Sequence, residues 1–410
     1  MVEVKILNGS RSIGGNCVRI EDKDRVLIFD QGIRFDLMTK YYSSFIMPQS
    51  LTELRDIGII PKPEWYEDAV SVYITHMHLD HLGVLSNIPK ELTAYLPSSS
   101  IYSYLEEKWS MSPTWTSLIP RKYYVEIEEL NPLEADKNNV IAVPVSHSAY
   151  PSFALLYFGT DENILYTGDF RTESFLDKDE FFKLNKAQDL MSYLENNRDI
   201  KVDTLIIEGT NFGTTRLPIS PSEAMSIAER LTSTSKSIIV TTHSLDLEYI
   251  LAFLKIAAKY GLNCYIATTQ ITKLLETVPE LPISPAIIEE HVTYPSHYFE
   301  KVSIDQVEPK ALIFVSYRGV VDFLKDISSI QPNLSDFAAI ISEPEPQVEE
   351  AYEYGVIANW FLKMGIQSYR IRVSGHYYIY QLGKILENIR PTRILPIHTL
   401  YPERLKRYLS

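Results

Sequence analysis

Residues 75–81 read Thr-His-Met-His-Leu-Asp-His and decide the fold. Three of the nine histidines in the 410-residue chain fall within six positions here, together with one aspartate. The apolar run at 70–75 leads into them and predicts a β-strand. A chance cluster of this density is improbable, so the pattern disfavours the alternative of ordinary surface histidines.

The spacing of the cluster predicts a metal site. His76 and His78 can project to one side after the strand, whereas Asp80 and His81 lie where the chain turns into a helix and can aim at a second point. Neutral imidazole suits zinc well, and a carboxylate completes a ligand set that is hard enough for two ions. We therefore expect a centre with two metal ions.

Two ions need more ligands than one loop supplies, and isolated residues elsewhere provide candidates. His147, Asp169 and His398 each follow an apolar segment that is predicted to be a strand. Taken alone, each would more often be a capping or packing residue. Their common position just after a strand, where the sites of α/β proteins gather, favours a role as ligands.

The composition limits the class of protein. The only cysteines, Cys17 and Cys264, are too few and too far apart for a thiolate metal site or a disulfide framework. No secretion signal starts the sequence and no stretch approaches the roughly 20 apolar residues of a membrane span, so we expect a cytoplasmic protein without membrane contact.

The net charge of −14 argues against a general nucleic-acid-coating surface. From Arg370 to the end, however, the sequence contains eight Lys and Arg residues and only two Glu residues. The net charge of this part is 8 − 2 = +6, and that of the rest is −20. This segment can form a local phosphate-binding wall. The alternative is that its charges only solvate a terminal helix and tail.

Periodicity separates the chain into a strand-rich part and a middle block of alternating helices and strands. In the first part, strands are expected at 4–7, 17–20, 26–29, 70–75, 140–145, 154–158, 164–167 and 204–207, and the segment 36–68 is expected to be a long surface excursion. After Glu208, continuous apolar strands between helices predict a parallel sheet covered on both faces. This block is a candidate inserted domain.

The motifs, in their order along the chain, resemble those of the metallo-β-lactamase superfamily. FDQG with Asp30, HMHLDH, His147 and YTGDFR with Asp169 carry this resemblance. It implies that His76, His78 and His147 bind one zinc, that Asp80, His81 and His398 bind the other, and that Asp169 bridges the two, with Asp30 a structural residue near the site.

Three further motifs resemble those of the β-CASP branch, which contains ribonuclease J, the cleavage and polyadenylation endonucleases and the DNA nucleases related to Artemis. They are LIIEGTNFG with Glu208, VSGHYY with His376 and LPIHT with His398. The resemblance implies an α/β fold: a metallo-β-lactamase αββα sandwich formed by 1–211 and 366–410, with a parallel β-CASP domain inserted at 212–365.

The resemblance also implies a reaction, the zinc-dependent hydrolysis of phosphodiesters with a metal-activated water as nucleophile. Asp80, Glu208 and His376 are the expected catalytic residues: His376 would contact the scissile phosphate and protonate the departing oxygen, and Glu208 would orient it. Further candidates for phosphate contacts are Ser374, Thr210 and Asn211.

The expected substrate is single-stranded RNA. A histidine at the last motif, here His398, accompanies RNA-processing members, whereas the Artemis-like DNA nucleases tend to carry Val there. DNA, a small phosphodiester or ester, and a non-catalytic role in an RNA-processing complex are the alternatives. Endonucleolytic or exonucleolytic action and a homodimer are left open.

Overall fold

The computed structural model describes residues 2–23, 25–43, 46–110, 125–213, 218–342 and 351–407. The chain divides into two compact units. The first comprises Met1–Thr172, Lys178–Arg216 and Gly375–Ser410, and the second comprises Glu173–Asp177 and Leu217–Ser374. We propose that the second unit is the inserted domain that the sequence predicts over 212–365.

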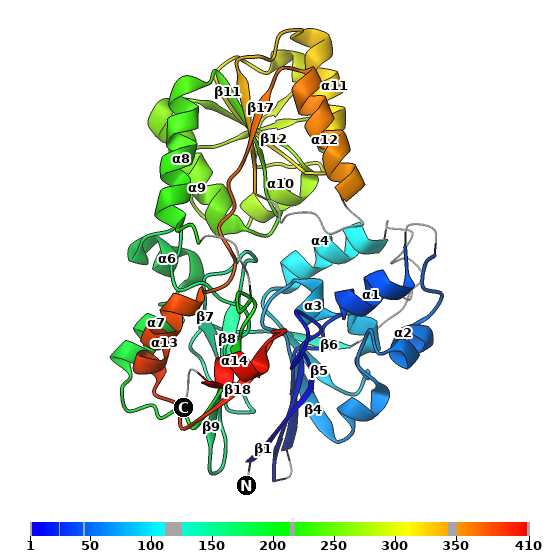
Figure 1. Ribbon diagram of the computed structural model, residues 1–410, viewed down its shortest axis with the longest axis vertical. Helices are drawn as coiled ribbons and strands as arrows, with labels where there is room; N and C mark the ends of the chain where they lie inside the picture. The colour runs from blue at the N-terminus through cyan, green and yellow to red at the C-terminus, as the bar shows by residue number, and fades with distance from the viewer. Residues whose placement is uncertain are drawn as a thin grey trace. The chain divides into compact units, whose positions relative to one another are not determined.

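Two sheets form the first unit (Figure 1). The six-stranded sheet has the order β1 (Val2–Asn8), β2 (Cys17–Asp22), β3 (Arg25–Phe29), β4 (Ala69–Tyr73), β5 (Thr93–Leu96) and β6 (Glu126–Glu129). The five-stranded sheet has the order β18 (Arg393–Ile397), β10 (Thr204–Glu208), β9 (Asn163–Tyr166), β8 (Phe153–Phe158) and β7 (Val140–Pro144). In this second sheet β18, β10 and β9 are parallel, which brings their carboxyl ends to one edge.

The two sheets pack face to face over a shared core. Alternate residues of each strand point inward, as the two-residue period of a strand requires. Val18, Ile20, Leu27, Phe29 and Tyr73 of the first sheet cluster with Val140, Leu155, Tyr166, Ile206 and Ile397 of the second. Because these side chains are almost completely buried, the sandwich is a rigid base for loops at its edges.

Helices cover the outer faces of the sandwich. The outward residues of the five-stranded sheet form a second core with α7 (Leu190–Asn196) and α13 (Leu382–Ile389). Further helices of the unit are α3 (Leu79–Leu82), η2 (Leu85–Asn87), α4 (Ser99–Ser110), α6 (Lys178–Asn185), η5 (Ile379–Gln381) and α14 (Pro402–Arg407). The layers therefore run helix, sheet, sheet, helix.

The segment 36–68 departs from the expected surface excursion. It contains α1 (Phe35–Tyr41), α2 (Leu51–Ile57) and the 3₁₀ helix η1 (Pro63–Tyr66). Leu54, Ile59 and Ile60 are buried in a small apolar cluster. The sequence did not predict these helices, because the segment is rich in Tyr, Pro and Ser and has too few apolar positions for a clear helical period.

The second unit is built on a seven-stranded parallel sheet, as the sequence predicts. Its order is β14 (Lys301–Val302), β13 (Ala286–Ile288), β12 (Asn263–Ala267), β15 (Ala311–Val315), β11 (Ser237–Thr241), β16 (Phe337–Ile341) and β17 (Gln367–Arg370). Helices α8 (Pro221–Thr234), α9 (Leu247–Tyr260) and α10 (Thr269–Leu275) lie on one side, and α11 (Val320–Ile330) and α12 (Ala351–Lys363) on the other; η3 spans Ile304–Gln306 (Figure 1).

In the described parts of both units, no helix is long and apolar enough to cross a membrane.

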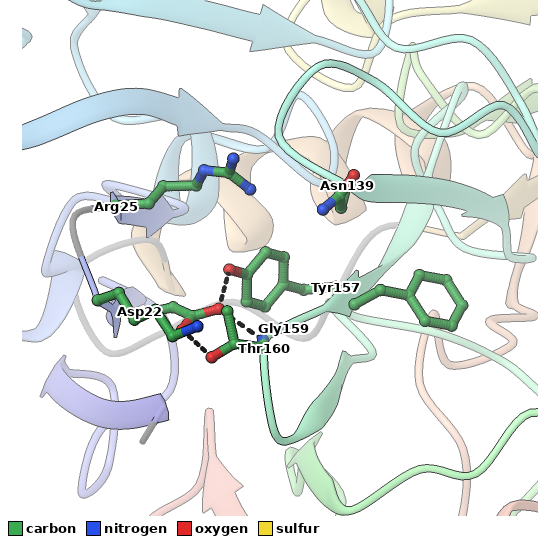
Figure 2. Close-up of a pocket in the computed structure, with 8 residues that line it drawn as sticks. Asp22, Arg25, Asn139, Tyr157, Gly159 and Thr160 are labelled. Carbon is green, nitrogen blue, oxygen red and sulfur yellow. Dashed lines mark hydrogen bonds between the residues drawn. The ribbon is translucent and has the colours of Figure 1, made fainter.

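A cavity of about 320 Å³ lies beside the turns β2–β3 and β8–β9, and it is lined by Asp22, Arg25, Tyr157 and Thr160 among others (Figure 2). The buried Asp22 carboxylate accepts hydrogen bonds from the Tyr157 hydroxyl (2.7 Å), the Thr160 amide (2.8 Å) and the Thr160 hydroxyl (2.5 Å). Burial alone would raise the pKa of Asp22, but the hydrogen bonds from Thr160 and Tyr157 outweigh it and lower the pKa below its usual value.

Asp22→Asn is expected to lower the free energy of unfolding at pH 7 by about 2 kcal/mol, because hydrogen bonds to a charged group are replaced by weaker ones. A lowered folded-state pKa means that this stabilisation is present above the unfolded pKa and is lost as the pH falls through the folded pKa. Urea unfolding at neutral and acidic pH should therefore show a difference between the two proteins that shrinks in acid. The exposed Asp199→Asn is the control, and an equal loss at both pH values would contradict the assignment.

Candidate metal centre

The candidate residues of the first unit stand where strands end. His76 and His78 follow β4, His147 follows β7, and Asp169 follows β9. Asp80 and His81 lie in the short helix α3, Glu208 is the last residue of β10, and His398 comes directly after β18. Because β9, β10 and β18 are neighbouring parallel strands, Asp169, Glu208 and His398 share one edge of the sheet.

All seven predicted ligands converge at that edge. Their possible donor atoms form overlapping groups within which the atoms lie no more than 4.8 Å apart. These groups are His76, His78 and His147; Asp80, His81 and His398; His76, His81 and Asp169; and Asp169, Glu208, His376 and His398. Asp169 belongs to two of these groups and therefore lies between the two histidine sets.

The distances between donor atoms fit two adjacent positions. His78 Nδ1 and His147 Nε2 are 3.2 Å apart at the first position. At the second, His398 Nε2 lies 3.2 Å from Asp80 Oδ2. Asp169 Oδ2 is 3.1 Å from His81 Nε2 and 3.6 Å from His398 Nε2.

Four of the histidines make a second contact through their Nδ1 atoms. His81 Nδ1 donates to Asp30 Oδ2 (2.7 Å), and His147 Nδ1 donates to the carbonyl of Gly375 (2.7 Å). In the same way, His398 Nδ1 contacts the Thr210 hydroxyl (2.7 Å), and His76 Nδ1 contacts the Thr75 hydroxyl (3.1 Å). Partners of this kind fix the ring and its tautomer, so the Nε2 atoms face the centre.

Asp30 holds the segment 75–81, which carries the histidine cluster, in place. Its carboxylate also accepts from the Thr75 amide (2.8 Å) and from the Tyr166 hydroxyl (2.6 Å). Asp30 and Tyr166 are fully buried, so these contacts take the place of hydrogen bonds to water. We therefore propose for Asp30 the structural role near the site that the sequence predicts.

The backbone of the Asp80 loop is held by close approaches of glycine. The Asp80 carbonyl accepts from the amides of Gly15 (3.0 Å) and Asn16 (3.1 Å). A Cβ atom on Gly32 would lie 1.6 Å from the same carbonyl oxygen, and one on Gly14, where φ is +80°, would lie 2.7 Å from Asp80 Oδ2. A side chain at either glycine would displace the carboxylate.

Three of the histidines are in the form that binds metal. Burial, together with neighbouring imidazoles, lowers the pKa values of His76 and His147 well below the usual range, and burial lowers the pKa of His78 to about 4. These three imidazoles are therefore neutral at pH 7. A cluster of neutral, desolvated imidazoles is the environment in which histidine coordinates metals.

Asp169 attracts positive charge into the cluster. Burial alone would raise its pKa, but the imidazoles of His398 and His81 hold the pKa well below its usual value, so it is a carboxylate. Burial alone would lower the pKa of His81, yet Asp169 and Asp30 raise it well above its usual value. In the metal-free chain, His81 therefore holds a proton between Asp30 and Asp169. A metal ion could supply the positive charge in place of this proton.

Two buried polar atoms complete the test of fit. Within the described part of the chain, His76 Nε2 and Asp169 Oδ1 have no hydrogen-bond partner. Buried polar atoms are normally paired, and a site for an ion is one of the usual reasons when they are not. The residues of the cluster therefore fit metal ions, and this cluster could bind metal.

Glu208 and His376 form a pair beside the cluster. His376 Nδ1 lies 3.0 Å from Glu208 Oε1 and 3.7 Å from Asp169 Oδ2. The hydroxyl of Tyr377 donates to the Glu208 carbonyl (2.6 Å), and the Asn211 amide donates to the carbonyls of His376 (3.2 Å) and Tyr377 (2.9 Å). Segment 376–377 is thus tied to the end of β10.

The predicted substrate-contact residues have other contacts. The Thr210 hydroxyl lies between Glu208 Oε2 (2.7 Å) and His398 Nδ1, and Asn211 holds the backbone at His376. Ser374 is half-buried and is the last residue of the second unit. The supporting roles of Thr75, Tyr166 and the Gly375 carbonyl were not predicted. Tyr166 belongs to the motif YTGDFR and Thr75 directly precedes HMHLDH, but nothing in the sequence pairs them with Asp30.

Comparisons with known proteins identify relatives of this chain. No protein-family model matches it. A ribonuclease J from Helicobacter pylori (strain 26695) is 24% identical over 98% of the chain, and one from Mycobacterium tuberculosis (strain H37Rv) is 22% identical over 97%. A ribonuclease J from Pyrococcus abyssi is 30% identical over 104 residues, which is 25% of the chain and 22% of that protein.

The chain matches 56% of the Helicobacter protein and 68% of the Mycobacterium protein. Among solved structures, a protein of unknown function from Enterococcus faecalis V583 superposes with a TM-score of 0.74 at 20% identity, covering 98% of this chain and 95% of the other. These matches confirm the predicted fold class.

Proposed function

We propose that this chain, a member of the β-CASP branch of the metallo-β-lactamase superfamily, is a metal-dependent hydrolase that cleaves single-stranded RNA. The observation that carries the proposal is the convergence of seven predicted ligands beside a paired Glu208 and His376. The ribonuclease J relatives, which match nearly the whole chain, support RNA as the substrate. His398 supports RNA over DNA by the resemblance described above.

We further propose that the metal is zinc and that each chain holds two ions. His76, His78 and His147 would hold one, and Asp80, His81 and His398 the other, with Asp169 between them. A ligand set rich in imidazole with two carboxylates suits zinc. When bound, zinc would supply an activated water and neutralise charge on the phosphate.

The protein's own residues prepare the rest of the reaction. Glu208 accepts from His376 Nδ1 and thereby fixes the ring, so the protonated His376 can deliver a proton from Nε2 to the departing oxygen of the phosphodiester. Thr210 links Glu208 to His398, which couples the proton donor to a ligand of the centre. The buried walls exclude water from these contacts and strengthen them.

End-labelled single-stranded RNA tests this function. The purified chain should shorten the RNA, a chelator should abolish the cleavage, and added Zn²⁺ should restore it. Product lengths also separate endonucleolytic from exonucleolytic action. Single-stranded DNA and methyl p-nitrophenyl phosphate, a base-free phosphodiester, are incubated in parallel with the RNA.

Each outcome has a defined consequence. If the RNA stays intact while the small phosphodiester or the DNA is hydrolysed, the proposed substrate is wrong although the hydrolytic centre is present. If none of the three is hydrolysed after reconstitution with Zn²⁺ or Mn²⁺, the chain is a non-catalytic protein.

A further inference from the structure

Three tyrosines follow His376 closely in the first unit, and two of them, Tyr378 and Tyr380, stack on each other. Tyr378 and Tyr380 have their ring centroids 6.0 Å apart at an interplanar angle of 8°, which is an offset stack. Tyr378 is half-buried, whereas Tyr380 is 67% exposed, the most exposed aromatic among the described residues of this unit. Single exposed aromatics are common on protein surfaces, so exposure alone does not mark a binding site.

The backbone that carries the pair is fixed to the candidate metal centre. The preceding segment 376–377 is held by Asn211 and by the contact of Tyr377 with Glu208. Gln381 then closes the turn: its side chain accepts from the Tyr378 amide (2.8 Å), and its own amide donates to the Tyr378 carbonyl (2.8 Å). Because this segment is already fixed, little conformational entropy is lost when a ligand stacks on its side chains.

The position also suits a polynucleotide. Tyr380 lies four positions after His376, so their Cα atoms lie at most about 14 Å apart. The returning segment 375–410 carries six Lys and Arg residues and two Glu residues, a charge of 6 − 2 = +4, whereas the rest of the chain carries −18. An exposed aromatic face in the basic part of an acidic chain is the combination that binds single-stranded nucleic acids.

Resting on the proposed function, we propose that Tyr380, backed by Tyr378, is a stacking platform for a nucleobase of single-stranded RNA next to the cleavage site. The rings are too close together for a base to enter between them, so the base extends the stack on the outer face of Tyr380. Stacking reads no base edge and therefore tolerates every base. The platform gives affinity and positions the chain without selecting a sequence.

Binding of a fluorescently labelled oligoadenylate to the metal-free protein, followed by anisotropy in chelator, tests the platform without cleavage. Tyr380→Ala should weaken binding by about 5- to 150-fold, the range for loss of one base–aromatic stack. Tyr380→Phe keeps the ring and should bind within about twofold of the unaltered protein. Phe182→Ala removes another exposed aromatic of the same unit, 55% exposed on α6, and should leave binding unchanged.

An oligomer with abasic sites separates stacking from a structural effect. The unaltered protein should bind it more weakly than the oligoadenylate, and Tyr380→Ala should cause little further loss. Hydrolysis of methyl p-nitrophenyl phosphate by the reconstituted variant should stay unchanged, because this substrate has no base.

The platform is overturned if Tyr380→Ala binds the oligoadenylate as tightly as the unaltered protein, if Tyr380→Phe fails to restore binding, or if the unaltered protein does not bind the oligomer. Ring-dependent binding without cleavage of RNA would instead overturn the proposed function and leave the platform standing.

Discussion

Asp169→Asn is expected to lower the rate of RNA cleavage by at least about 10³-fold, because several kcal/mol of transition-state stabilisation depend on the metal centre. The substitution keeps the size of the side chain and removes its charge. Asp169 Oδ2 lies within 3.7 Å of ring nitrogens of His81, His398 and His376. Asp169 also groups with His76 of the first ligand set, so one change affects both halves of the centre. Single-turnover cleavage of labelled RNA and metal content are measured on the same preparation.

The exposed Asp199→Asn is the matched control and should cleave RNA at the normal rate. Circular dichroism and thermal unfolding show whether the Asp169 variant is folded. A folded Asp169→Asn protein that retains a tenth or more of the activity would show that the carboxylate is not essential, and the two-ion arrangement would then be wrong.

His376→Ala is expected to slow RNA cleavage by about 10²- to 10⁴-fold, the usual contribution of a positioned general acid. The ring sits on the fixed segment beside Glu208 and has Nε2 directed away from that carboxylate contact. The loss should depend on the leaving group. RNA expels an alkoxide that needs a proton, whereas p-nitrophenolate departs without one.

The rate with methyl p-nitrophenyl phosphate should therefore fall far less than the rate with RNA. Glu208→Gln should behave like a milder His376→Ala, with a loss of about 10- to 100-fold on RNA, because it only orients the ring. Equal losses on the two substrates would assign His376 to binding or to metal coordination instead of proton transfer. The group Asp169, Glu208, His376 and His398 makes this alternative a real one.

The local spacing of residues predicts much of the site. His76, His78, Asp80 and His81 lie within six positions, so their approach to one another depends on a single strand and turn. The apolar periodicity likewise predicts the strands that deliver Asp169, Glu208 and His398, and their order implies a common edge. The three residues meet there because the carboxyl ends of neighbouring parallel strands lie at the same edge of a sheet.

The contacts that fix the ligands could not be predicted in the same way. His147 meets the Gly375 carbonyl across 228 positions of sequence, and Thr210 meets His398 across 188. A carbonyl has no signature in the sequence, and a threonine has many uses. The sequence shows that Thr210 lies two positions after Glu208, and we therefore expected it to contact phosphate. The sequence does not show that Thr210 lies close to His398 in space.

Weak elements escaped prediction for a related reason. The short strand β6 exposes most of its residues, and β14 has only two, so neither shows a clear period. The helices α1 and α2 pack only a narrow face into a small cluster. Tyr380 was missed because an exposed aromatic in a sequence looks the same as a buried one.

A titration of the metal-free protein with Zn²⁺, with RNA cleavage and bound metal measured at each step, tests whether a two-ion centre drives the reaction. We expect cleavage to be absent without metal, to rise with added zinc and to reach its plateau when two ions are bound per chain. Full cleavage in the absence of metal, or saturation with fewer than one bound ion per chain, would contradict it.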